Sequence, residues 1–517
     1  MTSSYIEGDG HMVIIDENSK IPLYTQLYEG IKADIVNGTL KPGTKLQSSR
    51  TMSTELHLSR NTVELAYGQL FAEGFITSIQ RKGYYVEALD TETFQQGGSC
   101  CDSCICHDFC DCRITGKCCD ACTCHHQDES DETPHQDILY DFKSGKLLHS
   151  DLPCNLWQRL IGRCFHDYRE DLALQKSVFG EAGLRSEIQK HILNYRDVSC
   201  TAEQIIVTTG TQFCLDLACQ LLKSFNRGLD IAMEEPGYDQ SRTTFRNNGL
   251  NICPMGLDKH GADVKALSAT NAIAAYITPS HQFPTGIVMP MSRRNELVEW
   301  ARQKDTFIIE DDYNCHFQHG VRMLPSVQSL CADRVFYIGS FSNVLFPCLS
   351  VSYMVVPEKL LDQLHRRFDN YTPFVSFLTQ KPLEMFMREG LWEGHLRKMK
   401  KAQRIKCEAL VDALNHRFGD SIHISAFHAG LHLLVRAEWP ITERELIGRA
   451  RRAGVGVYPT SNYWSRPEKS QSATVLLNYG GIPLKDIPDA VERLSMAWHD
   501  YDSGAMQDVE TGSFALR

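Results

Sequence analysis

Residues 100–126 gather the side chains with the clearest chemistry in the chain. The segment reads CCDSCICHDFCDCRITGKCCDACTCHH and holds ten of the twenty cysteines. CCDSCICH at 100–107 returns as CCDACTCH at 118–125, so the segment contains an internal duplication. Thiolates are soft ligands that suit zinc, Cu(I) and iron–sulfur clusters. The candidate metal ligands are Cys100, Cys101, Cys104, Cys106, His107, Cys110, Cys112, Cys118, Cys119, Cys122, Cys124 and His125.

The spacing within this segment favours several metal ions over one. Cys101 with Cys104, and Cys119 with Cys122, have the Cys-x-x-Cys spacing that lets two sulfurs reach one ion. Further Cys-x-Cys steps supply more sulfurs than one tetrahedral ion can use, which indicates a metallothionein-like cluster. A disulfide knot and an idle linker are the alternatives, and the first conflicts with reduced cytosolic thiols. The segment has few apolar residues, so its fold would come from the metal. The metal or cluster is left open.

Length, charge and hydropathy bound the rest of the chain. A chain of 517 residues predicts one small and one large domain, or three. The net charge of −11 argues against a protein that coats nucleic acid, but it allows a small local DNA reader. The sequence has no run of eighteen apolar residues and no charged n-region followed by an apolar stretch. We therefore expect a cytoplasmic protein with no membrane partner. The ten cysteines outside 100–126 are expected to be structural thiols.

Residues 13–90 predict a winged helix-turn-helix. Leu27, Ile31 and Ile35 share one face of a helix that Asn37-Gly38 ends. Ser48-Ser49 and Ser59 can cap two further helices, and the last of these turns Val63, Ala66, Tyr67 and Leu70 inward. FITSIQRKGYYVEAL then predicts a hairpin with a basic tip. A small three-helix bundle without DNA affinity is the alternative, and eight basic against nine acidic residues do not decide between them.

In a winged helix, the third helix enters the major groove by its N-terminal end, and neighbouring groups contact phosphates. The partner would be a double-stranded DNA operator. The predicted DNA-binding residues are Ser48, Arg50, Ser59, Arg60, Asn61, Thr62, Arg81, Lys82 and Gly83.

Residues 137–505 alternate amphipathic helices with short apolar strands, which predicts an α/β fold with a mostly parallel sheet. Helical patterns cover 183–196 and 211–225, and strand candidates are IIVTTG, AIAAYITPS, FIIEDD, VFYIGS and VSYMVV. Gly210, Thr211 and Gln212 form a strand-to-helix turn where backbone N–H groups suit a phosphate. Asp311, at a strand's end, can partner a pyridinium nitrogen. A Gly turn that binds nothing and a solvated acidic turn remain the alternatives.

Longer stretches carry a resemblance to a known family. PLYTQLYEGIKADIVNGTLKPGTKLQSSR and LSRNTVELAYGQLFAEGFI resemble the GntR-family winged helix. EEPGY, ITPSHQFPTGIVMPMSRR, EDDY, GLWEGHLRKM, GVGVYPTSNYW and LLNYGGI resemble a fold-type I aminotransferase domain. The chain from about 13 to 500, apart from the cysteine segment, is thus similar to MocR-type regulators. We expect a leader at 1–12, a DNA-binding domain at 13–90, the Cys-rich segment at 91–136, an aminotransferase-like effector and dimerisation domain at 137–505, and a tail at 506–517.

The resemblance also implies a site for pyridoxal phosphate (PLP). By position, the residues of a vestigial PLP site are Gly210, Thr211, Gln212, Tyr238, Asp311, Tyr313, Ser340 and Asn343. The resemblance further implies a homodimer and a small-molecule effector.

The sequence departs from this family at the residues that hold the cofactor. Asn343 stands where the family has the lysine that forms the Schiff base, and an amide nitrogen is not a usable nucleophile. Ser350 replaces an arginine near the cofactor phosphate, and Gln240 replaces an arginine of carboxylate recognition. Arg242 lies two residues further on and is a possible substitute. Gln47 replaces a proline of the winged helix and should leave its fold intact. The sequence therefore predicts no catalytic residue, no internal aldimine and no aminotransferase activity.

The leading hypothesis is a DNA-binding regulator with a catalytically degenerate aminotransferase-like domain. It would respond to metal or redox state through residues 100–126. A regulator that senses PLP, an amino acid or their adduct without a covalent bond is the first alternative. A working PLP-dependent aminotransferase and a metal store are the others.

Overall fold

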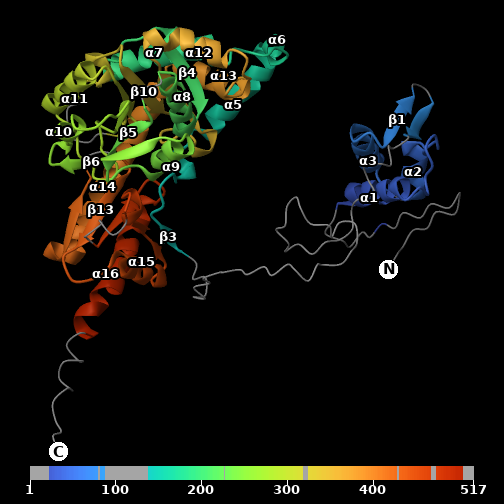
Figure 1. Cartoon of the computed structure of the whole chain (residues 1–517). Coiled ribbons are helices and arrows are strands. Elements are labelled where there is room, and N and C mark those ends of the chain that lie inside the picture. Colours follow the sequence, from blue (N-terminus) through green and yellow to red (C-terminus); the bar gives the residue numbers. More distant parts are fainter. Residues whose placement is uncertain are drawn as a thin grey trace, which may run out of the picture. The chain divides into compact units, whose positions relative to one another are not determined.

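The computed structural model describes residues 15, 22–56, 58–79, 82–87, 138–225, 228–317, 324–427, 430–466 and 473–504. The chain divides into two compact units, Met1–Glu129 and Ser130–Arg517, and each is treated by itself. The blue elements in Figure 1 belong to the first unit, and the teal to red elements belong to the second. Within these ranges, no helix is both long enough and apolar enough to cross a membrane.

The first unit contains three helices followed by a two-stranded antiparallel hairpin. The elements are α1 (Leu23–Val36), α2 (Ser49–Glu55), α3 (Arg60–Ala72), β1 (Ile76–Ile79) and β2 (Gly83–Val86). Ser48 and Ser59 are the N-caps of α2 and α3, and their side chains accept from Thr51 N and Thr62 N. Leu27, from α1, and Tyr67, from α3, are fully buried against each other's helices. The predicted winged helix-turn-helix is confirmed.

A mixed eight-stranded sheet forms the centre of the second unit (Figure 1). In spatial order, its strands are β4 (Ile205–Thr209), β11 (Val351–Val355), β10 (Val335–Ser340), β9 (Phe307–Asp311), β8 (Ala274–Ile277), β5 (Asp230–Glu235), β6 (Asn251–Asp258) and β7 (Gly261–Ala262). The strands from β10 to β6 are parallel, whereas β11 runs antiparallel to both of its neighbours. The predicted α/β class is confirmed.

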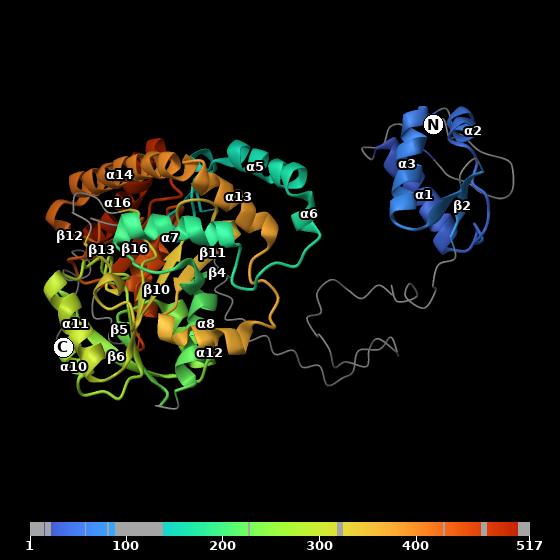
Figure 2. The same ribbon diagram turned by 90° about the horizontal axis from the view of Figure 1, so that it is seen from above.

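Helices cover both faces of this sheet, as the view from above shows (Figure 2). The helices of this part of the chain are α5 (Cys154–Asp167), α6 (Arg169–Leu172), α7 (Ala182–Arg196), α8 (Thr211–Lys223), α9 (Asp239–Asn247), α10 (Val264–Leu267), α11 (Met291–Gln303), α12 (Leu361–Phe368), α13 (Phe377–Arg388) and α14 (Leu391–Phe418). Successive side chains of a strand point to opposite faces of the sheet, so neighbouring residues show which helices cover each face. Val207 and Tyr353 pack with α7 and α13, whereas Ile206 and Met354 pack with α8 and α12. Because both faces are buried, β4 and β11 are mostly apolar and do not alternate with exposed polar residues.

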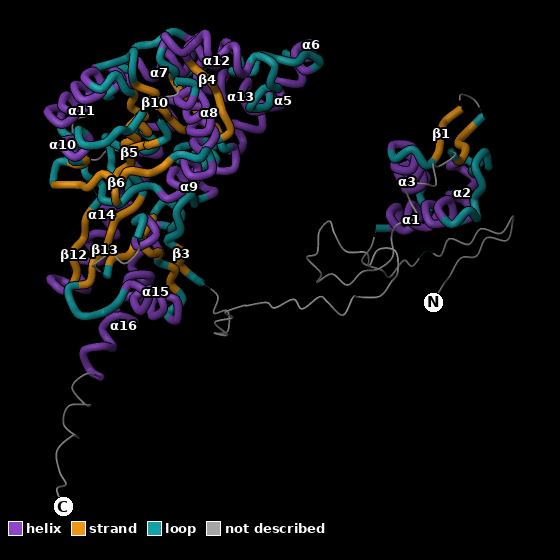
Figure 3. The backbone as a smooth tube through the Cα atoms, in the orientation of Figure 1, coloured by secondary structure: helices purple, strands orange, loops and turns teal. Residues whose placement is uncertain are grey.

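A smaller lobe follows the sheet and contains a four-stranded sheet of its own (Figure 3). Its strands, in spatial order, are β12 (Ile422–Ser425), β13 (His432–Ala437), β16 (Thr474–Asn478) and β15 (Tyr458–Pro459). Its other helices are α15 (Glu443–Arg452) and α16 (Ile487–Gly504). The start of the unit joins this lobe, because β3 (Tyr140–Asp141) pairs with β14 (Val455–Gly456). The lobe contributes part of the cavity described next.

Candidate effector pocket and DNA-binding surface

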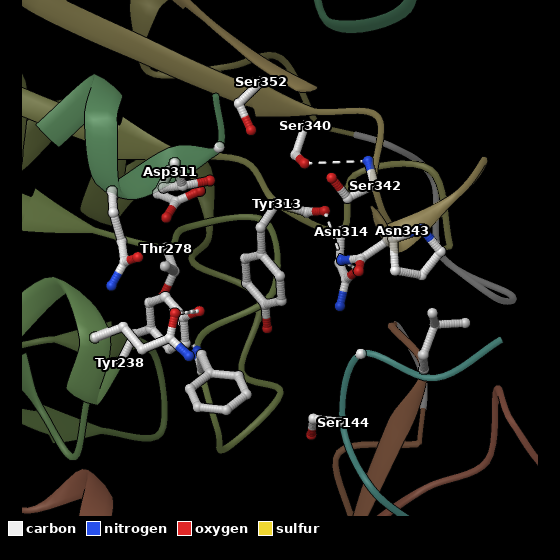
Figure 4. A pocket seen from close by; sticks show the side chains of 18 of the residues that line it. Ser144, Tyr238, Thr278, Asp311, Tyr313, Asn314, Ser340, Ser342, Asn343 and Ser352 are labelled. Atoms are coloured by element: carbon white, nitrogen blue, oxygen red, sulfur yellow. Dashed lines mark hydrogen bonds between the residues drawn. The ribbon is translucent and has the colours of Figure 1, made fainter. Parts of the chain in front are cut away.

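The eight residues predicted for a PLP site surround one cavity of about 520 Å³ in the second unit (Figure 4). The large sheet contributes the ends of β4, β9, β10 and β11, together with the start of α8. The smaller lobe contributes Leu431, His432, Tyr463 and Asn478. The structure therefore brings the eight predicted residues together, and their role in binding a ligand stays a prediction.

One end of the cavity presents neutral hydrogen-bond donors. Gly210 precedes α8 with φ of +82°, a backbone conformation that favours glycine. The first N–H groups of a helix have no intrahelical partner and carry a partial positive charge. Ser340, Ser342 and Ser350 add hydroxyls to the same lining. Among the described residues that line the cavity, none is a lysine or an arginine. This end can hydrogen-bond an oxygen-rich group, but no described side chain in the lining neutralises an anion.

Asp311, the last residue of β9, lines the cavity and is only 3% exposed. The hydroxyl of Tyr276 donates to its Oδ2 at 2.7 Å. Its Oδ1 is buried and has no hydrogen-bond partner among the described residues. Burial raises the pKa of this carboxyl to about 7, and no basic group counteracts it. A buried carboxylate in this state is suited to a ligand that brings a protonated nitrogen.

Asn343 lies in the turn after β10, at the position where the resemblance predicts a lysine. Its amide Nδ2 donates to Asn314 Oδ1 at 2.9 Å and to the backbone carbonyl of Tyr313 at 3.3 Å (Figure 4). The hydroxyl of Tyr313 is buried without a hydrogen-bond partner among the described residues. The amide at position 343 therefore closes a local hydrogen-bond network and offers no nucleophile.

Arg242, the possible substitute for an arginine that the resemblance predicts at position 240, does not reach the cavity. Its guanidinium donates to the carbonyls of Asn462 at 3.1 Å and Tyr463 at 2.5 Å. It is buried, and it is absent from the cavity lining. Gln240 does line the cavity and accepts a hydrogen bond from the Tyr238 hydroxyl at 2.8 Å. Arg242 thus anchors the segment after β15 to α9, and the carboxylate partner of the family is missing from the described lining.

Of the described residues that line the cavity, only Asp311 fits a group of PLP, the ring nitrogen. The unpartnered Oδ1 of Asp311 suits the ring nitrogen of a pyridine. Asn343 cannot form the covalent bond, and the hydroxyls and helix start at the other end carry no full positive charge. The site therefore does not fit PLP as a covalently held cofactor.

Several lining residues escaped the sequence interpretation. Tyr276, Thr278, Ser342 and Ser352 lie within or next to predicted strands, and this position was the signal that could have found them. The smaller-lobe residues and the neighbouring Ser144 and Gly145 carry no such signal. Only the packing of the lobe against the sheet edge brings them to the cavity.

The predicted DNA-binding residues lie on the first unit. Ser48, Arg50, Ser59, Arg60, Asn61, Lys82 and Gly83 are exposed, Thr62 is half-buried, and Arg81 falls outside the described residues. Arg60 Nε pairs with Glu64 Oε1 at 2.8 Å. Gln47, which replaces a family proline, keeps a structural role because its carbonyl accepts from the Tyr67 hydroxyl at 3.0 Å. The start of α3 therefore presents polar side chains to the surrounding solvent.

The predicted metal segment at 100–126 lies outside the described residues. Elsewhere, in the part of the chain that the structure describes, no group of three or more His, Cys, Asp or Glu side chains could hold a metal ion. The ten cysteines from Cys154 to Cys407 are free thiols, and six of them are buried. A metal centre thus stays a prediction for the Cys-rich segment alone.

Comparisons with known proteins agree with this architecture. Residues 23–86 match the model for bacterial regulatory proteins of the gntR family, and residues 164–447 match the model for aminotransferase class I and II. A kynurenine aminotransferase from Pyrococcus horikoshii superposes with a TM-score of 0.63 at 20% identity, covering 71% of this chain and 92% of that one. The fold and pocket therefore define an aminotransferase-like domain preceded by a gntR-type DNA-binding domain.

Two relatives align with this chain over nearly their whole length. The uncharacterized HTH-type transcriptional regulator YdeL of Bacillus subtilis is 33% identical over 480 residues, which cover 92% of this chain and 97% of the relative. The probable rhizopine catabolism regulatory protein MocR of Rhizobium meliloti is 28% identical over 510 residues, covering 98% of this chain and all of the relative. The chain belongs to the MocR-type family of HTH-type transcriptional regulators.

Proposed function

We propose that this regulator uses its aminotransferase-like domain to bind an effector without covalent attachment and without transamination. One observation carries the proposal. The side chain at position 343 is an amide that hydrogen-bonds to Asn314 and Tyr313, and the described cavity lining contains no side-chain amine. Without a lysine there is neither a covalent anchor nor a group to move the Cα proton of an amino acid.

Covalent capture tests this function. The protein is incubated with PLP, reduced with borohydride, digested and analysed by mass spectrometry. We expect no modification in the pocket of the natural chain, and a modified residue 343 in Asn343→Lys. Asn343→Gln is the matched control, because it lengthens the side chain without adding an amine. A stoichiometric adduct on a pocket residue of the natural chain, or turnover of amino acids with a keto acid, would contradict the proposal.

DNA binding by the first unit supplies the regulatory output, and α3 would read the operator from its N-terminal end. Asn61 is exposed there and carries an amide that can contact a base edge. Lys82, exposed at the start of the second hairpin strand, would contact a phosphate. Asn61→Ala should cost about 1–3 kcal/mol on the operator and relax specificity at one position. Lys82→Ala should weaken binding to all sequences and reduce the salt dependence. DNA footprints of the two variants are measured over a range of salt concentrations. Equal changes in affinity, specificity and salt dependence in both variants would contradict these roles.

The regulator would act as a homodimer, since a two-fold dimer suits an operator with paired half-sites. The aminotransferase-like domain would be the dimerisation platform. Sedimentation of the full chain tests this assembly. A monomer at the concentrations that protect the operator would contradict it.

A second input is a metal or redox signal through residues 100–126, and the duplicated Cys/His pattern favours it. Folding this segment around metal would change the reach between the two units and hence the half-site spacing that a dimer spans. Elemental analysis and a visible spectrum of protein purified without oxygen test the site. Iron with sulfide indicates a cluster, whereas several zinc or copper ions per chain indicate a thiolate centre. The proposed metal or redox signal would be contradicted if no metal copurified, or if metal loading left DNA affinity and footprint unchanged.

A further inference from the structure

The charges around the cavity are unusual for a site that resembles a phosphate-binding one. Asp239 and Asp311 are the acidic side chains in its lining, and the described lining contains no lysine or arginine. His432 is neutral, because burial lowers its pKa to about 4. The tyrosines of the lining also stay neutral, since burial raises the pKa values of Tyr238, Tyr276, Tyr313 and Tyr463. The described lining is therefore negative overall when Asp311 is ionised.

A cationic group is the complement of the Asp311 end. Oδ1 of this carboxyl is buried and has no partner among the described residues, while Oδ2 already accepts from Tyr276. A buried carboxylate without a charge partner is costly, and a charge-assisted N–H donor removes that cost. The strand end holds Asp311 in the wall of the cavity (Figure 4), so the donor must come from within the cavity.

Neutral hydroxyl groups on a ligand are the complement of the serine-lined part of the cavity. The Ser352 hydroxyl is buried without a partner among the described residues, and Ser340, Ser342 and Thr211 line the same region. The start of α8 contributes a partial charge of only about half a unit. A phosphate dianion would be desolvated there with no guanidinium or ammonium from the described lining, and anions buried without a charge partner bind poorly. Ser350, where the family has an arginine, is the position at which that cation is lost.

We propose that the pocket takes a protonated nitrogen heterocycle with hydroxyl substituents and no phosphate, and that it selects against the phosphorylated form of the same molecule. The ring N–H would donate to Asp311 Oδ1, and the hydroxyl groups would bond to the serine end. This inference rests on noncovalent binding as proposed above, and it adds the charge class of the ligand. The proposed selection against a phosphate is opposite to the aminotransferase resemblance, which implies a site for the phosphorylated molecule PLP.

Pyridoxine and pyridoxine 5′-phosphate are matched probes, because they differ only in the phosphate and neither has an aldehyde. We expect calorimetry on the full chain to show pyridoxine binding at least about tenfold more tightly, which corresponds to ~1.4 kcal/mol. The benzene analogue, in which CH replaces the ring nitrogen, should bind more weakly than pyridoxine. Asp311→Asn should weaken pyridoxine by more than about tenfold and leave the far-ultraviolet circular dichroism unchanged.

The Ser350→Arg variant tests the inference through a gain in binding of the phosphorylated probe. This exposed position should accept the longer side chain, and the added guanidinium should strengthen pyridoxine 5′-phosphate by at least about tenfold while changing pyridoxine little. Tighter binding of the phosphate form by the natural chain would overturn the inference and leave noncovalent effector binding intact. No measurable binding of pyridoxine would also overturn it. Failure of the proposed function itself has a different signature, the covalent adduct described above.

Discussion

Two neighbouring carboxylates at the end of β9 have opposite surroundings, although both are buried. Asp312 faces α7, where Arg196 Nε lies 2.6 Å from its Oδ2 and the Tyr337 hydroxyl donates to the same oxygen at 2.7 Å. Asp311 faces the cavity and accepts a hydrogen bond from the Tyr276 hydroxyl, and no described cation pairs with it. The Arg196 charge is the main influence that lowers the pKa of Asp312 against the effect of burial. Burial raises the pKa of Asp311 to about 7.

The difference shows how one strand end separates stability from ligand binding. Successive residues of an extended strand point to opposite faces of the sheet. Each carboxyl keeps one oxygen without a hydrogen-bond partner among the described residues, but the face toward α7 supplies Asp312 with a permanent counterion, whereas the face toward the cavity gives Asp311 none. A buried charge that holds the fold together is paired within the chain. An unpaired buried carboxylate instead lowers stability, and a ligand that pairs with it recovers the loss.

The largest predicted effect is on the Arg196–Asp312 pair. Arg196→Ala leaves Asp312 buried without a counterion and should lower the free energy of unfolding of the second unit by about 3–5 kcal/mol. Arg163→Ala, which breaks the partly exposed pair with Glu389, is the matched control and should cost no more than about 1 kcal/mol. Urea denaturation measures both. The Arg196→Ala/Asp312→Asn double variant should recover part of the loss, and a double variant no more stable than Arg196→Ala would break the comparison.

A smaller effect of opposite sign is predicted for Asp311→Asn. The folded pKa of about 7 lies above the unfolded value near 3.8, so burying the carboxylate costs stability above pH 7 and costs nothing below about pH 4. The variant should therefore be more stable than the natural chain by about 2–4 kcal/mol at pH 8, with the gain shrinking as the pH falls toward 4. Burial also raises the pKa of Glu234 to about 7, and the Asp311 charge adds to that rise, so the difference between the two proteins includes a smaller contribution of the same sign from Glu234. A gain that did not depend on pH would contradict this account.

The smallest predicted effect is a difference in pH dependence between two variants that each lose a tyrosine hydroxyl. Tyr276→Phe removes the hydrogen bond to Asp311 and should cost about 1–2 kcal/mol at pH 8, where that carboxylate is ionised, and less at pH 5. Tyr337→Phe removes the hydrogen bond to Asp312, which stays ionised beside Arg196, so its cost should be the same at both pH values. Thermal unfolding at the two pH values measures the contrast. Equal pH dependence of the two variants would show that the carboxylates do not differ in charge state.

Much of the fold was predictable because local patterns agree with the tertiary structure. The capping serines Ser48 and Ser59 and the apolar periodicity between them defined the winged helix, and apolar runs of the large domain became β4, β8, β9, β10 and β11. β5 was not predicted, because its sequence ends in Glu234 and Glu235 and looks like the start of a turn. The structure buries both glutamates at the sheet edge, where Thr278 donates to Glu234 Oε2 and Ser465 donates to Glu235. Such partners come from distant parts of the chain and leave no local signal.

The sequence by itself determined the chemistry that is absent from position 343, because an asparagine cannot act as a lysine in any fold. It also determined the duplicated thiol segment and the order of the domains. Only the tertiary structure decided that Asp312 pairs with Arg196, and that Arg242 bonds to the backbone after β15. Residue type sets which bonds a side chain can make. Which partners it meets depends on strand alternation and on the packing of the smaller lobe against the sheet edge.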